Sequence, residues 1–102
     1  MIAKKQYKKN EQLCRVTFRI PKKASIGARS IAVVGDFNNW SATDHLMKKL
    51  KSGEFTLALD LPANHEYQFR YLINDKIWEN DRGADKYIHS EYGNCDNSVV
   101  VV

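Results

Sequence analysis

The 102-residue sequence has no long hydrophobic run, and no segment approaches the ~20 consecutive apolar residues that a membrane-spanning helix needs. Its first residues are basic but are not followed by an apolar stretch, so no secretory signal peptide is indicated. We therefore expect a cytoplasmic protein with no membrane partner. Internal repeats and low-complexity segments are also absent, and the length predicts one domain.

Cysteine is scarce, with only two residues. Cys14 shares one side of an alternating pattern with Val16, Phe18 and Ile20, which predicts a small buried residue. Cys95 falls in an expected loop, and the two thiols could approach each other if the first and last strands are neighbours. Free thiols are favoured because the expected compartment is reducing. No CxxC pair and no closely spaced His/Cys set occurs, so neither a metal nor a cofactor is predicted.

The positive charge is concentrated at one end of the chain. The net charge is +4, and residues 1–12 contain four lysines against one glutamate, whereas residues 13–102 contain 12 Lys/Arg and 11 Asp/Glu. A nucleic-acid-binding domain usually spreads a basic stripe over its folded face. We therefore expect no nucleic-acid partner. Residues 1–12 are predicted to be a basic, flexible lead-in, and residues 13–102 a single module.

Alternation of apolar and polar residues with a period of two dominates the sequence and predicts β-strands. A polar loop is expected from residue 79 to residue 96, and only residues 41–45 could hold a helical turn. About seven short strands in a chain of this length predict an all-β, immunoglobulin-like β-sandwich. The predicted strands span residues 14–20, 30–34, 46–50, 55–61, 67–73, 77–78 and 98–102.

The same alternation assigns side chains to faces. If Phe69 and Tyr71 point into the core, Arg70 must point outward as a fixed group with several donors. Trp78 follows the next hairpin turn and Trp40 lies in a loop rich in Gly, Asp and Asn, so neither continues a core pattern. Flat aromatic rings beside polar side chains suit the apolar face and hydroxyl rim of a sugar. The alternative is that either tryptophan is the buried core tryptophan common in such sandwiches.

Several motifs together resemble the family 48 carbohydrate-binding modules, also described as isoamylase early-set domains. The motifs are GDFNNW at residues 35–40, LALDLP at 57–62, YQFRY at 67–71, WEND at 78–81 and NSVV at 97–100. The family includes the glycogen-binding domain of the AMP-activated protein kinase β subunit and amino-terminal domains of isoamylases and branching enzymes. The likeness covers roughly residues 13–102 and is strongest to short stand-alone bacterial forms. It implies an early-set sandwich that binds α-glucans.

The resemblance also implies which residues bind the sugar. The two tryptophans of the family's site match Trp40 and Trp78, and its basic residue matches Arg70. The apolar residue that presses on the sugar matches Tyr92, where the kinase domain has leucine. A threonine-like position matches Asn94, and the asparagine of the last loop falls on either of two residues, Asp96 and Asn97.

Catalysis is not predicted. A glycosidase needs two carboxyl groups on either side of the scissile bond, one of them with a raised pKa. Glu79 and Asp81 are near neighbours in an expected polar loop and are interpreted as turn or surface acids. The histidines lie at loops or strand ends without nucleophile or metal spacing; they are His45, His65 and His89.

The sequence therefore predicts a non-catalytic module that binds glycogen, starch or maltooligosaccharides, and a glycogen- or starch-active enzyme is a candidate partner. Two alternatives remain. One is a protein-interaction module that kept the fold and lost the sugar site. The other is a module associated with a glycoside hydrolase family 13 type enzyme, against which the absence of a second large domain argues.

Overall fold

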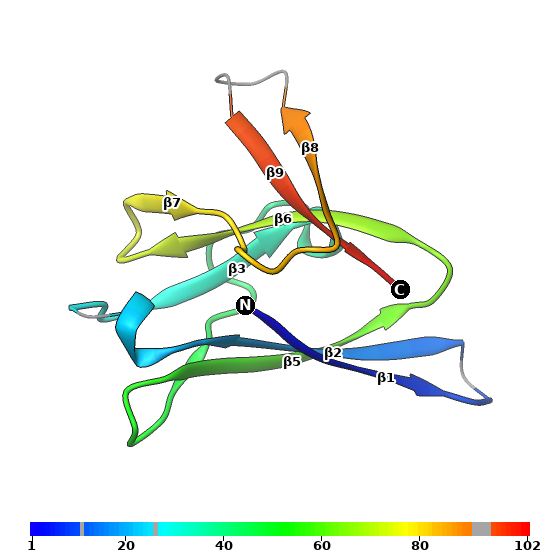
Figure 1. The fold of residues 1–102 in the computed structure, drawn as a ribbon, viewed down its shortest axis with the longest axis horizontal. Coiled ribbons are helices and arrows are strands. Elements are labelled where there is room, and N and C mark those ends of the chain that lie inside the picture. Colours follow the sequence, from blue (N-terminus) through cyan, green and yellow to red (C-terminus); the bar gives the residue numbers. More distant parts are fainter. Residues whose placement is uncertain (11, 26, 91–94) are drawn as a thin grey trace.

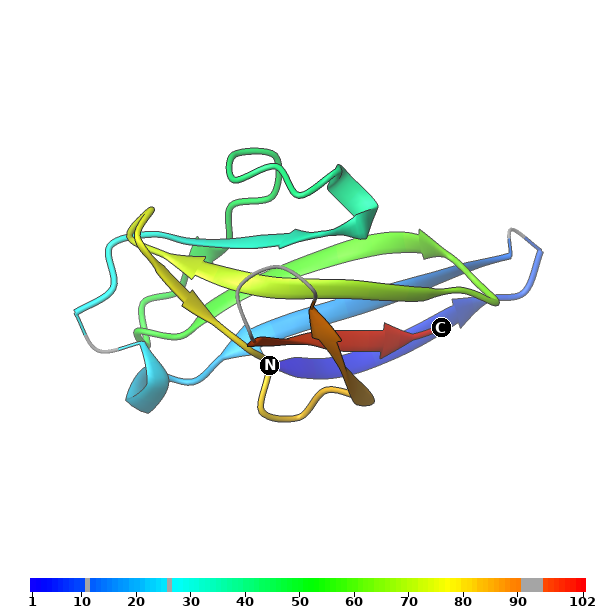
Figure 2. The same ribbon diagram turned by 90° about the horizontal axis from the view of Figure 1, so that it is seen from above.

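The computed structural model describes residues 1–10, 12–25, 27–90 and 95–102. Two antiparallel sheets lie face to face, which confirms the predicted all-β sandwich (Figure 1). Seen from above, the strands of the two layers run in roughly similar directions (Figure 2). Sheet A has the strand order β1 (Ile2–Lys8), β2 (Leu13–Ile20), β5 (Phe55–Pro62) and β4 (Lys48–Lys49). Sheet B has the order β3 (Ile31–Gly35), β6 (Glu66–Ile73), β9 (Cys95–Val101) and β8 (Lys86–Ser90), and β7 (Ile77–Glu79) also pairs with β6.

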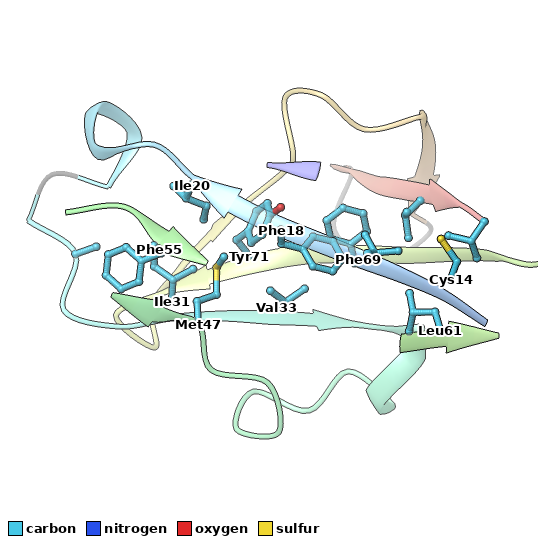
Figure 3. Packing of buried hydrophobic residues seen from close by; sticks show 14 residues of the cluster. Cys14, Phe18, Ile20, Ile31, Val33, Met47, Phe55, Leu61, Phe69 and Tyr71 are labelled. Atoms are coloured by element: carbon cyan, nitrogen blue, oxygen red, sulfur yellow. The ribbon is translucent and has the colours of Figure 1, made fainter. Parts of the chain in front are cut away.

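The core lies between the sheets and is centred on aromatic rings (Figure 3). Phe18 of β2 meets Phe69 of β6 with ring centroids 5.3 Å apart, and Phe69 meets Tyr71 at 5.7 Å, both edge to face. Such geometry adds about 0.5–1.5 kcal/mol per pair beyond the area that the rings bury. The predicted alternation of β2 is confirmed, because Cys14 and Phe18 are both fully buried. Neither Cys14 nor Cys95 forms a disulfide.

The amino-terminal segment differs from the predicted flexible lead-in, because residues 2–8 form β1. This strand pairs with β2 along its length, and its first residues pack against the core. The Ile2 amide donates to the carboxylate of Asp81 at 2.7 Å, and Lys5 pairs with Asp85 at 2.6 Å. β1 is an edge strand of sheet A, where lysines are common because they discourage pairing with other chains. The lysines of this edge strand therefore made the segment resemble a polar lead-in in the sequence.

A second difference lies in the stretch expected to be one polar loop. Residues 86–90 form β8, which pairs with β9 at the edge of sheet B. The described residues therefore form nine strands, against about seven predicted. The helical turns also lie elsewhere than at residues 41–45. They are two short 3₁₀ turns, η1 (Lys22–Ala24) and η2 (Asp36–Asn38).

The hairpin between β6 and β7 places Trp78. Its loop residues Asn74 and Asp75 have left-handed φ angles of 53° and 58°. Ile73 pairs with Ile77, so the loop has three residues, and its two consecutive left-handed positions are occupied by Asn and Asp, which tolerate this conformation best among residues with a Cβ atom. The resulting register sets Trp78 directly opposite Leu72, on the face of the sheet that points away from the core.

Candidate functional site

An open groove of about 580 Å³ lies on the outer face of sheet B. Four of the residues predicted for the site line it together, although they come from separate parts of the chain. These are Trp40, Arg70, Trp78 and Asn97. The rest of the lining comes from β6, the start of η2 and the edge strand β8, and consists of Asp36, Gln68, Ile88, His89 and Ser90.

Both tryptophans are surface residues. Trp40 is 38% exposed and Trp78 is 46% exposed, whereas the core rings Phe18 and Phe69 are fully buried. The alternative of a buried core tryptophan is therefore excluded for this fold. Two large aromatic side chains that stay in solvent beside one groove form an apolar surface that the sandwich does not need for its own packing.

The turn that carries Trp40 depends on Gly35. A Cβ atom at this position would lie 2.4 Å from the carbonyl oxygen of Gln68 and 2.7 Å from the Cβ atom of Phe69. Only glycine lets the end of β3 approach β6 so closely. The glycine therefore allows the loop, and Trp40 with it, to lie directly against β6.

Asn38 is buried and ties this turn together. Its Oδ1 accepts hydrogen bonds from the amides of Gly35 at 3.1 Å and Ser41 at 3.2 Å, and its Nδ2 donates to the carbonyl of Val33 at 3.0 Å. These partners fix the orientation of the amide. Nδ2 is therefore also the donor to Nδ1 of His45, 2.8 Å away, so that nitrogen carries no proton.

Asp36 links the same turn to β6. One carboxylate oxygen accepts the indole Nε1–H of Trp40 at 3.0 Å, and the other accepts the main-chain amide of Gln68 at 2.7 Å. Asp36 also lines the groove. Sequence reasoning placed it in a motif without giving it a role, because a contact with β6 cannot be read from the loop alone.

Arg70 points outward from β6, as the alternation predicts. Its Nη2 donates to the main-chain carbonyl of Asp96 at 3.1 Å and also contacts the thiol of Cys95. The Nε atom is buried and has no hydrogen-bond partner among the described residues. A buried donor without an acceptor is rare, because it loses its bonds to water without replacing them.

Gln68 and Asn97 form a polar pair beside Arg70. The Nδ2 atom of Asn97 donates to Oε1 of Gln68 at 3.0 Å. In this orientation the other amide nitrogen and oxygen of the pair have no partner among the described residues. A donor and an acceptor are therefore present within the lining. Gln68 could have been found from the sequence, because it shares the outward face with Arg70.

The other predicted site residues have different positions. Asp96 does not line the groove; its carbonyl receives Arg70 and Nδ2 of Asn80, the latter at 2.7 Å. Its carboxylate lies 3.3 Å from Nδ1 of His89. Of the two residues on which the expected asparagine could fall, Asn97 is the one in the groove. Tyr92 and Asn94 lie outside the described residues.

The acid that was interpreted as a surface residue, Asp81, is in fact completely buried. Its carboxylate accepts the amides of Ile2 and Gly83 and the hydroxyl of Tyr71, each at 2.7 Å. Burial, with the negative charge of Asp81 beside it, raises the pKa of the Tyr71 hydroxyl well above its ordinary range. Because Glu79 is exposed and Asp81 lies inside, the two acids do not face a common cleft.

The described residues contain no cluster of three or more His, Cys, Asp or Glu side chains arranged to hold a metal ion. In the same part of the chain, no helix has the length and apolar character needed to cross a membrane.

Comparisons with known proteins show which family the chain belongs to. A sequence profile of the glycogen recognition site of AMP-activated protein kinase matches residues 19–102. The β-2 subunit of 5'-AMP-activated protein kinase from mouse is 31% identical over 77 residues, which is 76% of this chain and 27% of that subunit. The human subunit shows the same identity over 26% of its length. The chain thus spans about a quarter of these relatives.

Proposed function

The chain belongs to the family of the glycogen recognition site of AMP-activated protein kinase, and from this premise we propose that its groove binds α-linked glucans without cleaving them. The observation that carries the proposal is the convergence of exposed Trp40 and Trp78 with Arg70 on one groove. Glycogen, starch and maltooligosaccharides present chains of glucose with an apolar face and a rim of hydroxyls. The two indole rings of the lining match the apolar face, and its polar side chains match the hydroxyls.

Stacking on the tryptophans supplies the apolar part of binding. The axial C–H groups of a glucose ring cover an indole face, and both surfaces leave water. Each Å² of apolar area removed from water contributes roughly 25 cal/mol. Stacking on the two indole rings can therefore supply a substantial part of the binding free energy of a weak sugar complex. Neither indole has to leave the core to do this, because both are already exposed.

Hydrogen bonds to hydroxyls supply the orientation. Arg70 lines the groove, and a guanidinium N–H is a suitable donor to a sugar hydroxyl oxygen. Gln68 and Asn97 add a donor and an acceptor with spare capacity. Arg70 is held on a strand and is already bound to the carbonyl of Asp96, so little side-chain freedom remains to be lost on binding.

The proposal assigns no chemistry to the groove. Among the described residues of its lining the one carboxylate is that of Asp36, which accepts two N–H donors, and Asp81 lies in the interior. A pair of opposed carboxyl groups is what hydrolysis of a glycosidic bond requires. We expect the chain to hold a glucan for a glycogen- or starch-active enzyme.

The test is a residue-by-residue titration of ¹⁵N-labelled protein with maltoheptaose, β-cyclodextrin and cellohexaose. The two α-linked sugars should shift the indole signals of Trp40 and Trp78 and the amides of β6, and the β-linked sugar should shift none of them. Folded protein that responds to none of the three would favour a protein-interaction module. Release of reducing ends from glycogen by repurified protein would contradict the absence of catalysis.

A further inference from the structure

We propose that Asp36 is the positioning residue for Trp40: its carboxylate fixes the plane of the indole, so that this platform offers a ligand its ring face and not its N–H group. The proposal rests on the glucan binding proposed above and concerns how the groove is prepared for it. It assigns Asp36 a role in holding another residue and no contact with the sugar.

Asp36 directly follows the last residue of β3 that pairs with β6. The last residue pair between β3 and β6 is Gly35 with Phe69, so Asp36 stands opposite Gln68 where β3 has already turned into η2. The carboxylate accepts the Gln68 amide at 2.7 Å and thus replaces the main-chain acceptor that β3 no longer provides. This bond holds the carboxylate on a rigid strand rather than on a loop.

The residues at the end of this turn have a backbone conformation that side chains disfavour. Asn39 and Trp40 both have left-handed φ angles, 54° and 59°. Side chains with a Cβ atom disfavour this region, and bulky residues such as tryptophan rarely occupy it. The amide of Trp40 is held by the carbonyl of Gly35 at 2.8 Å, but that bond fixes the main chain only.

The indole itself needs a separate constraint. Trp40 is 38% exposed, so part of its side chain has no packing partner among the described residues. Its Nε1–H is the only polar donor of the side chain, and Asp36 receives it at 3.0 Å. The Trp40 main chain is held by the carbonyl of Gly35 and the indole Nε1–H is held by Asp36, so the indole ring keeps one plane beside the groove.

Two consequences follow for recognition. The occupied N–H of Trp40 cannot donate to a hydroxyl, so the hydroxyl contacts fall to Arg70, Gln68 and Asn97. An indole whose plane is fixed before binding also loses less side-chain freedom when a sugar stacks on it. Trp78 has no such bond from its Nε1 among the described residues and is the less restrained platform.

The native protein provides the first test. The indole N–H of Trp40 should exchange with solvent more slowly than that of Trp78, as measured by ¹H–¹⁵N NMR without any ligand. Equal exchange rates would overturn the positioning role. This readout does not depend on sugar, so a native chain that fails to bind maltoheptaose would overturn the proposed function and leave this measurement intact.

The second test is the variant Asp36→Asn. The two donors bind different carboxylate oxygens of Asp36, so in the variant one of them would face the new NH₂ group in place of an acceptor. Exchange of the Trp40 indole N–H should accelerate, and affinity for maltoheptaose should fall by about fivefold or more. Asp44→Asn is the matched control, because Asp44 is exposed in the same loop and does not line the groove. It should leave both readouts unchanged.

A double-mutant cycle separates positioning from direct contact. Trp40→Phe keeps an aromatic face but removes the N–H that Asp36 holds, so Asp36→Asn should cost much less affinity in that background than in the native one. Equal losses in both backgrounds would show that Asp36 acts on the sugar or on the fold, and would overturn the proposal. Thermal unfolding of all four proteins verifies that each compared variant is folded.

Discussion

The outer faces of the two sheets carry comparable residues and use them differently. On sheet A, Arg15 of β2 stands opposite Asp60 of β5, with Nε 2.9 Å from Oδ1, and Lys8 of β1 adds a second ion pair at 3.0 Å. Hydrogen bonds from Arg15 and Lys8 lower the pKa of Asp60 from 3.8 to about 2. On this face the charge of Asp60 is matched by two cations of the same sheet.

On sheet B, Arg70 occupies a similar position in mid-strand but bonds to a carbonyl and a thiol. Among the described residues no carboxylate pairs with it, and its Nε is buried without an acceptor. Exposed tryptophans flank it, whereas small residues, Thr17 and Ala58, stand opposite each other on sheet A. The comparison teaches that an outward arginine can have a carboxylate partner on a neighbouring strand, as Arg15 has, or none among the described residues, as Arg70 has.

The largest effect is expected from breaking the link between the two layers. Asp81→Ala removes the acceptor of three buried or half-buried donors, one from β1 in sheet A and one from β6 in sheet B. Unsatisfied groups of this kind cost about 1–3 kcal/mol each, so we expect a loss of roughly 3 kcal/mol or more in the free energy of unfolding. Denaturant unfolding measures it, and Asp44→Ala is the exposed control. A loss below about 1 kcal/mol would show that the network contributes little.

Next in size are the platforms of sheet B. Trp78→Ala and Trp40→Ala should each weaken binding to maltoheptaose at least tenfold, or ~1.4 kcal/mol, because each removes a stacking face. Stability should change little, since a core tryptophan would cost ~3–5 kcal/mol on truncation and these are exposed. Calorimetric titration and denaturant unfolding give the two numbers. Folded Trp78→Ala with native affinity would remove this residue from the site.

The two arginines sharpen the comparison directly. Arg70→Ala should weaken glucan binding severalfold, because it deletes the donors of the groove, and Arg15→Ala on the opposite face should leave the affinity unchanged. The same titration serves both variants. Equal losses would mean that the two substitutions act through the fold and not through contacts within the groove, and would remove Arg70 from the site.

The smallest effect concerns the matched face. Because the folded-state pKa of Asp60 is depressed, its contribution to stability is present above the unfolded value of 3.8 and is lost as pH falls through about 2. Asp60→Asn should therefore flatten this part of the acid-unfolding curve slightly and change neutral-pH stability little, because exposed ion pairs are weak. An unchanged curve between pH 4 and pH 2 would contradict the lowered pKa.

Most of the fold could be predicted because strands with one buried face leave a regular pattern. β2, β5 and β6 all follow the alternation that the sequence shows. The two strands that were missed, β1 and β8, are both sheet edges with mostly exposed residues. A strand that buries little leaves no hydrophobic period, so its position depends on hydrogen bonds to a neighbour that is distant in sequence.

The residues of the site were likewise predicted only in part. Arg70 faces outward as its strand pattern predicts, and the exposure of Trp40 and Trp78 agrees with their departure from the core pattern. His89 was not expected in the lining because β8 was not expected as a strand. Asp81 was misjudged because its donors come from three separate segments of the chain. Local patterns predict which way a side chain points, but not which distant groups it meets.

The hairpin of β8 and β9 projects beyond the rest of sheet B (Figure 1). Ile88 and His89 of this hairpin line one part of the groove, and Trp40 and Trp78 line the part carried by the sandwich itself. A ligand that contacts both parts binds only while β8 and β9 are folded as strands of sheet B, so binding and local unfolding of the hairpin are linked equilibria. Amide protons of β8 should consequently become more protected from hydrogen exchange in the presence of saturating glucan, by a factor that grows with sugar concentration, while those of β1 on the far sheet keep their rates.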